Sequence, residues 1–493
     1  MKTVNPLKPS ERMRISRHHP AELEPRRRAT VFEEVSLGFT EEEAVAEATR
    51  CLECANPICT DGCPVNIDIR TFIQQIYLRN FTAAAETIRL TNSLPAICGR
   101  VCPQEEQCEE ICTLGRKHKP VAIGKLERFV ADYEMRLHRQ SGSAERAKPT
   151  QSVAVVGGGP AGLTCAAELA KMGYGVTLFE ALHAVGGVLR YGIPEFRLPR
   201  TILNEEIRRV ENLGVKIVTN FLVGRTATID EFFAEWGFNA VFLGTGAGTP
   251  HFLGIPGENF SGVYSANEFL TRINLMHADK FPQFDTPIKI GKRIAVIGGG
   301  NTAMDAVRTA KRIGAERAYL LYRRSKNEMP AREEEVLHAE EEGIEMMFLV
   351  NPTRILGTSD HWVCGIELQR MELGEPDASG RRKPVPVPGS EFIIELETII
   401  EAVGQSPNPI IQSTTPGLET SKRGTIQALI GQQTSRQGVF VGGDVARGGA
   451  TVILAMRDGR SAAKEIDTFL LAERRRKERV DAFYVGSQTT VIA

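Results

Sequence analysis

Eight of the ten cysteines lie in two short runs, and thiols at this density could hold metal. The first run, "CLECANPICTDGCP" (51–64), has the spacing C-x2-C-x4-C-x3-C-P, and the second, "CGRVCPQEEQCEEIC" (98–112), has C-x3-C-x5-C-x3-C. Zinc sites usually pair two short C-x2-C knuckles. Runs that end in Cys-Pro are typical of ferredoxin-type segments, in which the last cysteine serves the other cluster. We therefore favour two [4Fe–4S] clusters over zinc and over reduced structural thiols.

The stretch "SVAVVGGGPAGLTCAAELAKMGYGVTLFE" (152–180) is typical of a strand, a glycine turn, a helix and a second strand. Gly157, Gly159 and Gly162 form G-x-G-x-x-G, in which glycine permits a tight turn and close approach to a pyrophosphate at the helix N-terminus. Glu180 ends the next strand, where a carboxylate binds ribose hydroxyls. The pattern predicts a dinucleotide site. The alternative is a structural turn beside a surface glutamate.

We expect this first nucleotide to be FAD and not NAD. In "GGVLRYGIPEFRLP" (186–199), Gly186 and Gly187 can place backbone beside an extended cofactor. Asp444, far along the chain in "VGGD", suits a ribityl hydroxyl or the pyrophosphate from a second direction. Two distant segments that close on one ligand are what a long dinucleotide with an isoalloxazine ring requires.

A second glycine turn, "GGGNTAMD" (298–305), fits G-x-G-x-x-A between another strand and helix. Its following strand ends in "LLYRRS", so Arg323 and Arg324 stand where a carboxylate would bind the ribose 2′-hydroxyl. Guanidinium groups would instead hold a 2′-phosphate. The second turn therefore predicts NADPH over NADH, unless the two arginines are merely solvated.

The two glycine turns predict two α/β domains, and the cysteine runs lie in a separate helical region. Residues 31–140 have helical periodicity, 141–150 is linker-like, and a third strand–turn–helix element, "GVFVGGDVARGGATVILAMRDGRSAAKEI", follows the second unit. The predicted fold is α/β with an N-terminal all-α iron–sulfur domain and two Rossmann-like domains, the second inserted in the first. The expected divisions are a basic arm (1–30), a helical domain with two [4Fe–4S] clusters (31–147), the FAD domain in two parts (148–286 and 401–475), the NADPH domain (287–400) and a C-terminal tail (476–493).

Composition sets the broad class. A chain of 493 residues, 42% hydrophobic and 25% charged with a formal charge of −1, is typical of a multidomain globular protein with no general attraction to nucleic acid or membrane. There is no apolar signal-peptide region and no run of the ~20 apolar residues that a membrane helix needs. We expect a cytoplasmic protein, where clustered thiols favour metal over disulfides. The arginines near the start are expected to form a solvated arm or, alternatively, a strap on a partner subunit.

The three predicted cofactors form a chemical series. NADPH delivers two electrons as a hydride, iron–sulfur clusters carry one each, and a flavin converts between them. The α/β part has only Cys165, expected as a buried small hydrophobe, and Cys364, which has no assigned role. Because no dithiol pair is available there, we expect the electrons to leave through the clusters. No side chain has to act as an acid or base.

Taken together, these motifs and "VAIGKLERF", "YRRSKNEMPA" and "VGGDVARGGATVILAMRDGR" resemble one family. It is that of the small (beta) subunit of NADPH-dependent glutamate synthase. Its relatives include the N-terminal half of dihydropyrimidine dehydrogenase and the large subunit of NADH-dependent ferredoxin:NADP oxidoreductase. The similarity spans about residues 30 to 470. It implies a helical iron–sulfur domain followed by an FAD domain that an NADPH domain interrupts.

The resemblance also implies how the cysteines are divided between the two clusters. One cluster would take Cys51, Cys54, Cys59 and Cys112. The other would take Cys63, Cys102, Cys108 and a non-cysteine ligand, Glu127, where the similar pyrimidine enzyme has glutamine. Cys98 would then be a neighbour, and whether Glu127 or Cys98 completes the second cluster stays open.

Nucleotide contacts follow in the same way. The resemblance implies that Arg197 and Thr451 contact FAD and that Asn301 and Thr302 join the second turn in contacting NADPH. The full expected FAD set is Gly157, Gly159, Pro160, Ala161, Gly162, Glu180, Gly187, Val188, Arg197, Val223, Gly443, Asp444, Thr451 and Val452. The expected NADPH set is Gly298, Gly300, Asn301, Thr302, Arg323 and Arg324.

Several partners satisfy this pattern. In the first hypothesis, the chain passes electrons from NADPH through FAD and two [4Fe–4S] clusters to a large FMN-containing glutamate synthase subunit in a hetero-oligomer. That partner would make glutamate from glutamine and 2-oxoglutarate. In the second, the partner is ferredoxin-linked, as in a ferredoxin:NADP oxidoreductase, an electron-bifurcating complex or a sulfide dehydrogenase. A third is a non-catalytic scaffold, against which the intact glycine turns and cysteine runs argue.

Overall fold

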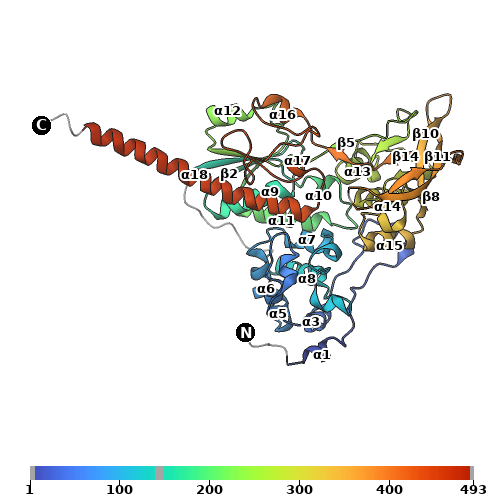
Figure 1. The fold of residues 1–493 in the computed structure, drawn as a ribbon, viewed down its shortest axis with the longest axis horizontal. Coiled ribbons are helices and arrows are strands. Elements are labelled where there is room, and N and C mark those ends of the chain that lie inside the picture. Colours follow the sequence, from blue (N-terminus) through green and yellow to red (C-terminus); the bar gives the residue numbers. More distant parts are fainter. Residues whose placement is uncertain (1–5, 139–148, 150, 379, 489–493) are drawn as a thin grey trace.

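The computed structural model describes residues 6–138, 149, 151–378 and 380–488. Figure 1 shows a helical lobe near the N-terminus, an α/β lobe beside the long C-terminal helix, and a second α/β lobe with an antiparallel extension. The linker expected at 141–150 lies outside the described residues except for Pro149.

The helical domain carries the cysteines on short helices and loops between longer helices. Thr40 begins the first long helix with a reciprocal cap, because its hydroxyl accepts from the Glu43 N–H (3.2 Å) and the Glu43 carboxylate accepts from the Thr40 N–H (2.8 Å). Apolar residues at helical spacing, such as Phe72, Ile73 and Ile76, form the core. The elements are α1 (Pro9–Arg12), α2 (Pro25–Arg28), α3 (Glu41–Thr49), α4 (Ile58–Asp61), α5 (Ile69–Tyr77), α6 (Phe81–Arg89), α7 (Pro95–Val101), η1 (Gln104–Glu106), η2 (Thr113–Arg116) and α8 (Ile123–His138).

The first α/β unit is a parallel sheet in the order β16-β4-β1-β2-β3. Its last strand comes from near the C-terminus, with Val439 paired to Val241, so the chain returns to this sheet after forming the second unit. The predicted insertion is confirmed. The elements are β1 (Ser152–Val156), α9 (Pro160–Lys171), β2 (Gly175–Phe179), α10 (Val188–Tyr191), α11 (Arg200–Asn212), β3 (Lys216–Val218), α12 (Ile229–Ala234), β4 (Ala240–Leu243), α16 (Ile410–Thr414), β16 (Val439–Val441), α17 (Asp444–Arg447) and α18 (Val452–Gln488).

The second unit is a parallel sheet in the order β6-β14-β7-β8-β9, extended by antiparallel strands β10 to β13. The second domain was expected to begin at residue 287. The strand β6 precedes that residue but pairs with β14, so this sheet includes an earlier part of the chain. The elements are β6 (Val263–Ser265), α13 (Ala266–Asn274), η3 (Ala278–Lys280), β7 (Arg293–Ile297), α14 (Asn301–Arg312), β8 (Arg317–Tyr322), η4 (Lys326–Glu328), α15 (Glu333–Glu341), β9 (Glu345–Phe348), β10 (Val350–Gly357), β11 (Val363–Pro376), β12 (Arg382–Pro386), β13 (Phe392–Glu395) and β14 (Thr398–Glu401). The short strands β5 (Thr249–Pro250) and β15 (Gln405–Ser406) pair with each other between the units.

The basic N-terminal segment packs on the chain itself, so the expectation of a solvated arm is wrong for its two buried arginines. The Arg12 guanidinium donates to the Cys51 carbonyl (2.7 Å) and pairs with Glu53 (3.3 Å). Arg28 pairs with Glu341 and Glu342 next to α15 in the second α/β unit. Buried guanidinium groups need such carboxylates, and their positions depend on the folded chain. The strap therefore spans two domains of this chain.

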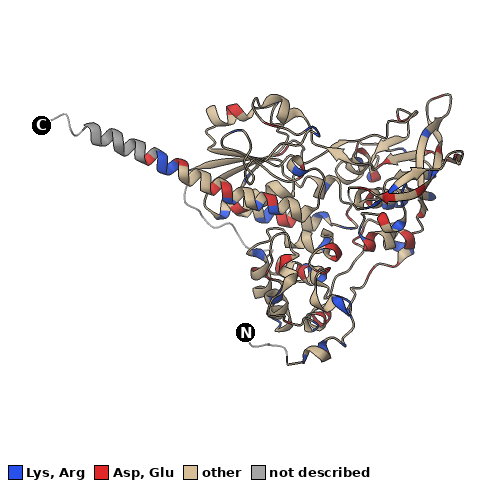
Figure 2. Cartoon of the chain, viewed as in Figure 1, with Lys and Arg blue, Asp and Glu red and all other residues tan. Residues whose placement is uncertain are grey.

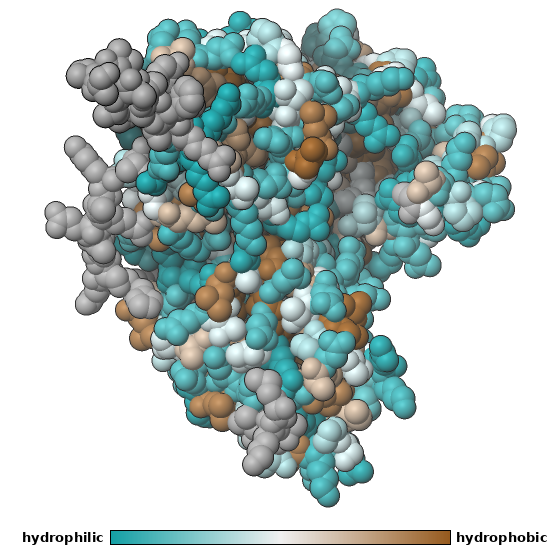
Figure 3. Space-filling view, turned by 60° about the vertical axis from the view of Figure 1, so that its left-hand side comes forward, coloured by the Kyte–Doolittle hydropathy of each residue, from teal (hydrophilic) through white to brown (hydrophobic). Residues whose placement is uncertain are grey.

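The outer surface is mixed in character. On the face that Figure 3 shows, hydrophobic side chains form small separate groups among hydrophilic ones. Acidic and basic residues are interspersed along α18 and around α15 (Figure 2), and the C-terminal half of α18 projects from the body (Figure 1). In the part of the chain that the structure describes, no helix has the length and apolar character required to cross a bilayer.

Candidate functional site

Four half-exposed thiols line one cavity of the helical domain: Cys51, Cys54, Cys59 and Cys112. Apolar side chains, including Leu52, Ile58 and Val121, form much of the remaining wall. Burial, with the neighbouring thiols adding to it, raises the pKa of Cys51 and of Cys59 to about 12. Such crowded thiols ionise only when a cation compensates their charge, so the donor set fits a thiolate-bound metal centre. Four thiolates suit zinc or a [4Fe–4S] cluster.

A second group of donors is buried deeper in the same domain: Cys63, Cys102, Cys108 and Glu127. Burial raises the pKa of Cys63 to about 11 and that of Cys108 well above its ordinary value, and the negative charge of Glu127 adds to both. The carboxylate therefore lies near these thiols. The structure brings together the four side chains that the resemblance assigns to the second cluster, and their role as ligands stays a prediction.

Asn92 connects both candidates for the last ligand of this buried group. Its amide nitrogen donates to Glu127 Oε1 (2.7 Å), and its amide oxygen lies 3.7 Å from the Cys98 thiol. Burial raises the pKa of Glu127 to about 8, although the Asn92 hydrogen bond opposes the shift. Asn92 lies outside both cysteine runs, so no motif in the sequence singles it out.

The first glycine turn has no room for larger residues. Gly157 has a φ of +101°, and a Cβ on Gly162 would lie 1.9 Å from the Gly157 carbonyl oxygen. A Cβ on Gly187 would lie 2.8 Å from the Gly159 Cα, so the segment at 186–187 packs directly on the turn. Pro160 begins α9 immediately behind it. This cradle of bare backbone is what the approach of a pyrophosphate requires.

Glu180 braces the same turn from the end of β2. Its Oε2 accepts from the Gly158 N–H (2.8 Å) and its Oε1 from the Leu182 N–H (2.9 Å), and burial raises its pKa. Each carboxylate oxygen can accept a further bond. The side chain is therefore positioned and has the capacity to bind ribose hydroxyls, as expected for the FAD site.

The C-terminal segment closes over this turn. A Cβ on Gly443 would lie 3.1 Å from the Ala161 Cβ, which places the Gly-Gly-Asp turn against the start of α9. Burial raises the pKa of Asp444 to about 6. Burial, together with the charges of Asp444 and Glu180, raises the pKa of Tyr191 to about 12, so the three side chains lie near one another. Tyr191 lies within the quoted "GGVLRYGIPEFRLP", but nothing in the sequence marked it.

The other residues expected at FAD have varied surroundings. Val188 is exposed at the start of α10, and Val223 is buried in the core of the sheet. Thr451 and Val452 begin α18, where the Thr451 hydroxyl accepts from the Leu454 N–H (3.4 Å). No contact of these side chains identifies a nucleotide, so their assignment stays a prediction.

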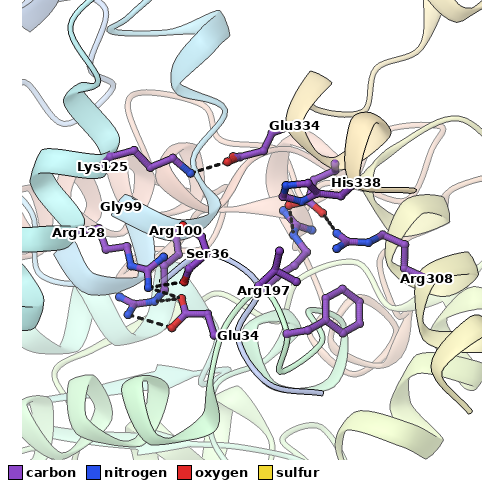
Figure 4. A pocket seen from close by; sticks show the side chains of 13 residues that line it. Glu34, Ser36, Gly99, Arg100, Lys125, Arg128, Arg197, Arg308, Glu334 and His338 are labelled. Carbon is purple, nitrogen blue, oxygen red and sulfur yellow. Dashed lines mark hydrogen bonds and ion pairs between the residues drawn. The ribbon is translucent and has the colours of Figure 1, made fainter. Parts of the chain in front are cut away.

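Arg197 has a different setting from the one that the resemblance implied. Its guanidinium pairs with Asp305 (2.8 Å) and Glu335 (2.9 Å), which lie on α14 and α15 of the second α/β unit. Figure 4 shows Arg197 in the pocket between the lobes, near Arg308 and His338. In this structure the side chain joins the two nucleotide units, and its contact with FAD stays a prediction.

The second glycine turn has the same backbone plan. Gly298 has a φ of +147°, and a Cβ there would lie 2.5 Å from the Ala402 carbonyl oxygen. Gly300 precedes α14, and the exposed Thr302 lies in its first turn. The Asn301 amide oxygen accepts from the Arg332 N–H (3.1 Å), so this side chain braces the turn from within the protein.

The two arginines at the end of β8 are not equivalent. Arg323 is exposed, whereas Arg324 is buried and pairs with Asp377 (2.5 Å) while donating to the Arg382 carbonyl (2.8 Å). Asp377 compensates the charge of Arg324 in this structure. Arg323 is therefore the better placed of the two to meet a 2′-phosphate.

Two family descriptions match most of the chain. Residues 27–139 match "Dihydroprymidine dehydrogenase domain II, 4Fe-4S cluster", and residues 150–459 match "Pyridine nucleotide-disulphide oxidoreductase". The first match covers both cysteine groups and favours iron–sulfur over zinc. The second covers both glycine turns and the C-terminal segment that returns to the first sheet.

Similar proteins include subunits of different named enzymes. The glutamate synthase [NADPH] small chain of Halomonas elongata is 36% identical over 462 residues, which cover 92% of this chain and 97% of that one. The NADP(+)-dependent formate dehydrogenase subunit beta of Moorella thermoacetica is 40% identical over 436 residues, which cover 84% of this chain and 60% of that one. The structure of FprA from Mycobacterium tuberculosis in complex with NADPH aligns with a TM-score of 0.56 at 20% identity, covering 67% of this chain and 86% of that one, and shows the fold alone.

These findings confirm the fold class and the expectation of an NADPH-dependent flavin and iron–sulfur oxidoreductase. The expected cofactors, FAD, NADPH and [4Fe–4S] clusters, are confirmed with it. The assignment of individual residues to each cofactor stays a prediction.

Proposed function

This chain belongs to the pyridine nucleotide-disulphide oxidoreductases with an N-terminal 4Fe-4S domain, the family that includes the glutamate synthase small chains, and we propose that it passes electrons from NADPH to a partner subunit. When bound, FAD would accept a hydride and release electrons singly to the clusters. The side chains position the nucleotides and hold the iron, and none has to act as an acid or base.

The observation that carries this proposal is the contact between the flavin unit and the cysteine domain. Helix α18 begins at Val452, directly after Thr451, and both residues are expected at FAD. Its Met456 Sδ lies 3.5 Å from the Cys98 Sγ. Cys98 in turn lies beside Cys102 of the buried group. One turn of helix thus separates the predicted flavin site from the predicted cluster site.

Burial orders the two thiol groups along this route. The group with Cys63 and Cys102 is buried and lies beside Cys98, which contacts α18, whereas the group with Cys51 and Cys59 is half-exposed. We infer that electrons reach the buried group first and leave from the half-exposed one. The other two thiols offer no alternative pair, because Cys165 is buried on α9 and Cys364 is exposed on β11.

Within this class we propose the role of a glutamate synthase small subunit. The partner would be a large FMN-containing subunit that forms glutamate from glutamine and 2-oxoglutarate in a cytoplasmic hetero-oligomer. Support comes from the small chains of Halomonas elongata and Escherichia coli, nearly the whole of which has a counterpart here, at 97% and 94% of their lengths. This correspondence over nearly their whole length supports the small-subunit role.

A second candidate is an electron-transfer subunit with another partner, such as a ferredoxin-linked one. Two relatives support this second candidate. The chain is 40% identical to a formate dehydrogenase beta subunit and 38% identical to the NADPH-Fe(3+) oxidoreductase subunit beta of Geobacter sulfurreducens. The matched region is 84% of this chain and 60% and 63% of those two proteins, so the shared region is compatible with either kind of partner.

The test uses anaerobically purified protein. We expect iron, labile sulfide and FAD, bleaching of the flavin by NADPH, and turnover with a dye acceptor. Addition of a glutamate synthase large subunit with glutamine and 2-oxoglutarate should then give NADPH-dependent glutamate. Reduction of ferredoxin without glutamate formation would favour the second candidate, and zinc in place of iron would contradict both.

A further inference from the structure

The back of the second glycine turn is closed by a short segment, 330–332. The Ala331 N–H donates to the Gly299 carbonyl (3.2 Å), and the Arg332 N–H donates to the Asn301 amide oxygen (3.1 Å). A Cβ on Gly300 would lie 3.9 Å from Pro330 Cγ, in ordinary contact. Two successive backbone N–H groups of this segment therefore support the turn, and the Pro330 ring lies beside it.

The Arg332 side chain runs the opposite way, into the helical domain. Its guanidinium pairs with Glu105 through Nε (2.9 Å) and Nη2 (3.2 Å), and it donates to the Gln104 amide oxygen (3.1 Å) and to the Arg100 carbonyl (3.2 Å). The Arg332 side chain is 5% exposed. A planar fork held at several points is a rigid anchor that a flexible ammonium cannot reproduce.

The anchor point is itself rigid. Gln104 lies between Cys102 and Cys108, and its amide nitrogen donates to the Cys98 carbonyl (3.1 Å). A Cβ on Gly124 would lie 2.3 Å from the Gln104 side chain, so that side chain has no room to move toward α8. Arg332 thus connects the second turn to the loop that bears two predicted cluster ligands.

We propose that Arg332 is a positioning residue for the pyridine nucleotide: it anchors segment 330–332 in the iron–sulfur domain and so holds the second glycine turn in the geometry that binds NADPH. This inference rests on the proposed binding of NADPH at that turn. The guanidinium is bound by residues of the helical domain, and it acts on the turn through the segment and Asn301.

The same interface offers a matched control. Lys125 on α8 pairs with Glu334 at the start of α15 (2.6 Å), and Figure 4 shows this bond crossing between the two lobes. It joins the same two domains within two residues of Arg332. Glu334 also pairs with Arg332 (3.2 Å), so Lys125→Met leaves this carboxylate to Arg332 and keeps the Arg332 contacts with Glu105 and Gln104. A merely structural tie predicts similar effects for both residues.

The experiment compares Arg332→Gln, Arg332→Lys and Lys125→Met as full-length holoproteins. NADP+ affinity is measured by titration, hydride transfer by the rate of flavin bleaching against NADPH concentration, and integrity by iron content and thermal unfolding. We expect Arg332→Gln to weaken NADP+ binding about tenfold or more. This corresponds to the loss of about one hydrogen bond to a charged group. Arg332→Lys should recover only part of the affinity, and Lys125→Met should stay within about twofold of wild type.

Equal nucleotide affinity in Arg332→Gln and Lys125→Met would overturn the inference. If Arg332→Gln does not fold, Glu105→Gln weakens the anchor from the other domain, because it removes the charge that pairs with Arg332 while the Gln104 and Arg100 contacts stay. A smaller loss of NADP+ affinity is then expected, and an unchanged NADP+ affinity overturns the inference. If NADPH does not bleach the flavin of the wild-type protein, that result would instead contradict the proposed function itself.

Discussion

The two glycine turns share a backbone plan but are closed in different ways. The first is covered by the returning C-terminal segment, with Gly443 against Ala161, and is flanked by the buried Glu180 and the half-buried Asp444. The second is supported by segment 330–332, whose Arg332 is anchored in another domain, and it has the exposed Arg323 beside it. The first arrangement suits a cofactor that stays bound, and the second suits one that exchanges. The shared motif thus indicates nucleotide binding at both turns. The segment that closes each turn indicates whether the nucleotide stays bound or exchanges.

The largest expected effect breaks the first turn. In Gly162→Val, the new Cβ would lie 1.9 Å from the Gly157 carbonyl oxygen, so the turn or the protein must unfold. We expect purified protein with less than about a tenth of the wild-type FAD, because a clash of this size exceeds what a core tolerates at a cost of ~1–3 kcal/mol. Visible flavin absorbance per chain measures it.

The second turn provides the control. Ala303 occupies the corresponding position of G-x-G-x-x-A, so Ala303→Gly should retain FAD and lose only about 1 kcal/mol of stability. Full FAD content in Gly162→Val would contradict the assignment of the first turn to this cofactor.

A smaller effect is expected at Arg323. Removing one guanidinium from a 2′-phosphate should lower NADPH affinity about tenfold to a hundredfold, since a hydrogen bond to a charged group contributes ~1.5–3 kcal/mol. The affinity for NADH should not change in Arg323→Ala. Michaelis constants for both nucleotides measure the discrimination.

Arg324→Ala serves as the comparison, because this side chain is paired with Asp377. We expect it to lower the thermal stability of the β11–β12 hairpin region more than the affinity for NADPH. If Arg324→Ala and not Arg323→Ala removed the preference for NADPH, the assignment would pass to the buried arginine.

The smallest effect concerns pH and Asp444 in flavin-depleted protein. Burial raises the pKa of Asp444 from 3.8 to about 6, so the unfolded chain loses this proton first as the pH rises. The folded protein then loses stability between about pH 4 and 6, by no more than ~3 kcal/mol for a two-unit shift. Asp444→Asn should remove this loss, and its unfolding midpoint should rise relative to wild type across that window. If the unfolding midpoints of the two proteins instead changed in parallel with pH, the pKa of Asp444 would not be raised by folding.

Much of the site could be predicted from local spacing. Each glycine turn lies within one strand–turn–helix–strand unit and each cysteine run is short, so sequence patterns record them directly. The return of the chain to the first sheet was also predictable, because a third strand–turn–helix element needs a sheet to join. The start of the second domain, expected at residue 287, was harder to predict, because β6 is short and its pairing with β14 is long-range.

The basic N-terminal segment shows what spacing does not record. Six arginines in a polar stretch indicate solvation, yet Arg12 and Arg28 are buried. Their partners, including Glu53 and Glu342, lie tens to hundreds of residues away, and an acidic residue at such a distance carries no local signal. The same holds for Asn92 beside Glu127.

The amino-acid sequence by itself determined which groups this protein can hold, because glycine turns, an acidic or basic strand end and clustered thiols act through local geometry and donor chemistry. Only the tertiary structure decided how they are connected. It placed α18 against Cys98, paired Arg324 with Asp377 and tied the second turn to the cysteine domain through Arg332. These contacts join residues far apart in the chain, and they arise when buried charges and thiols find partners across domain interfaces.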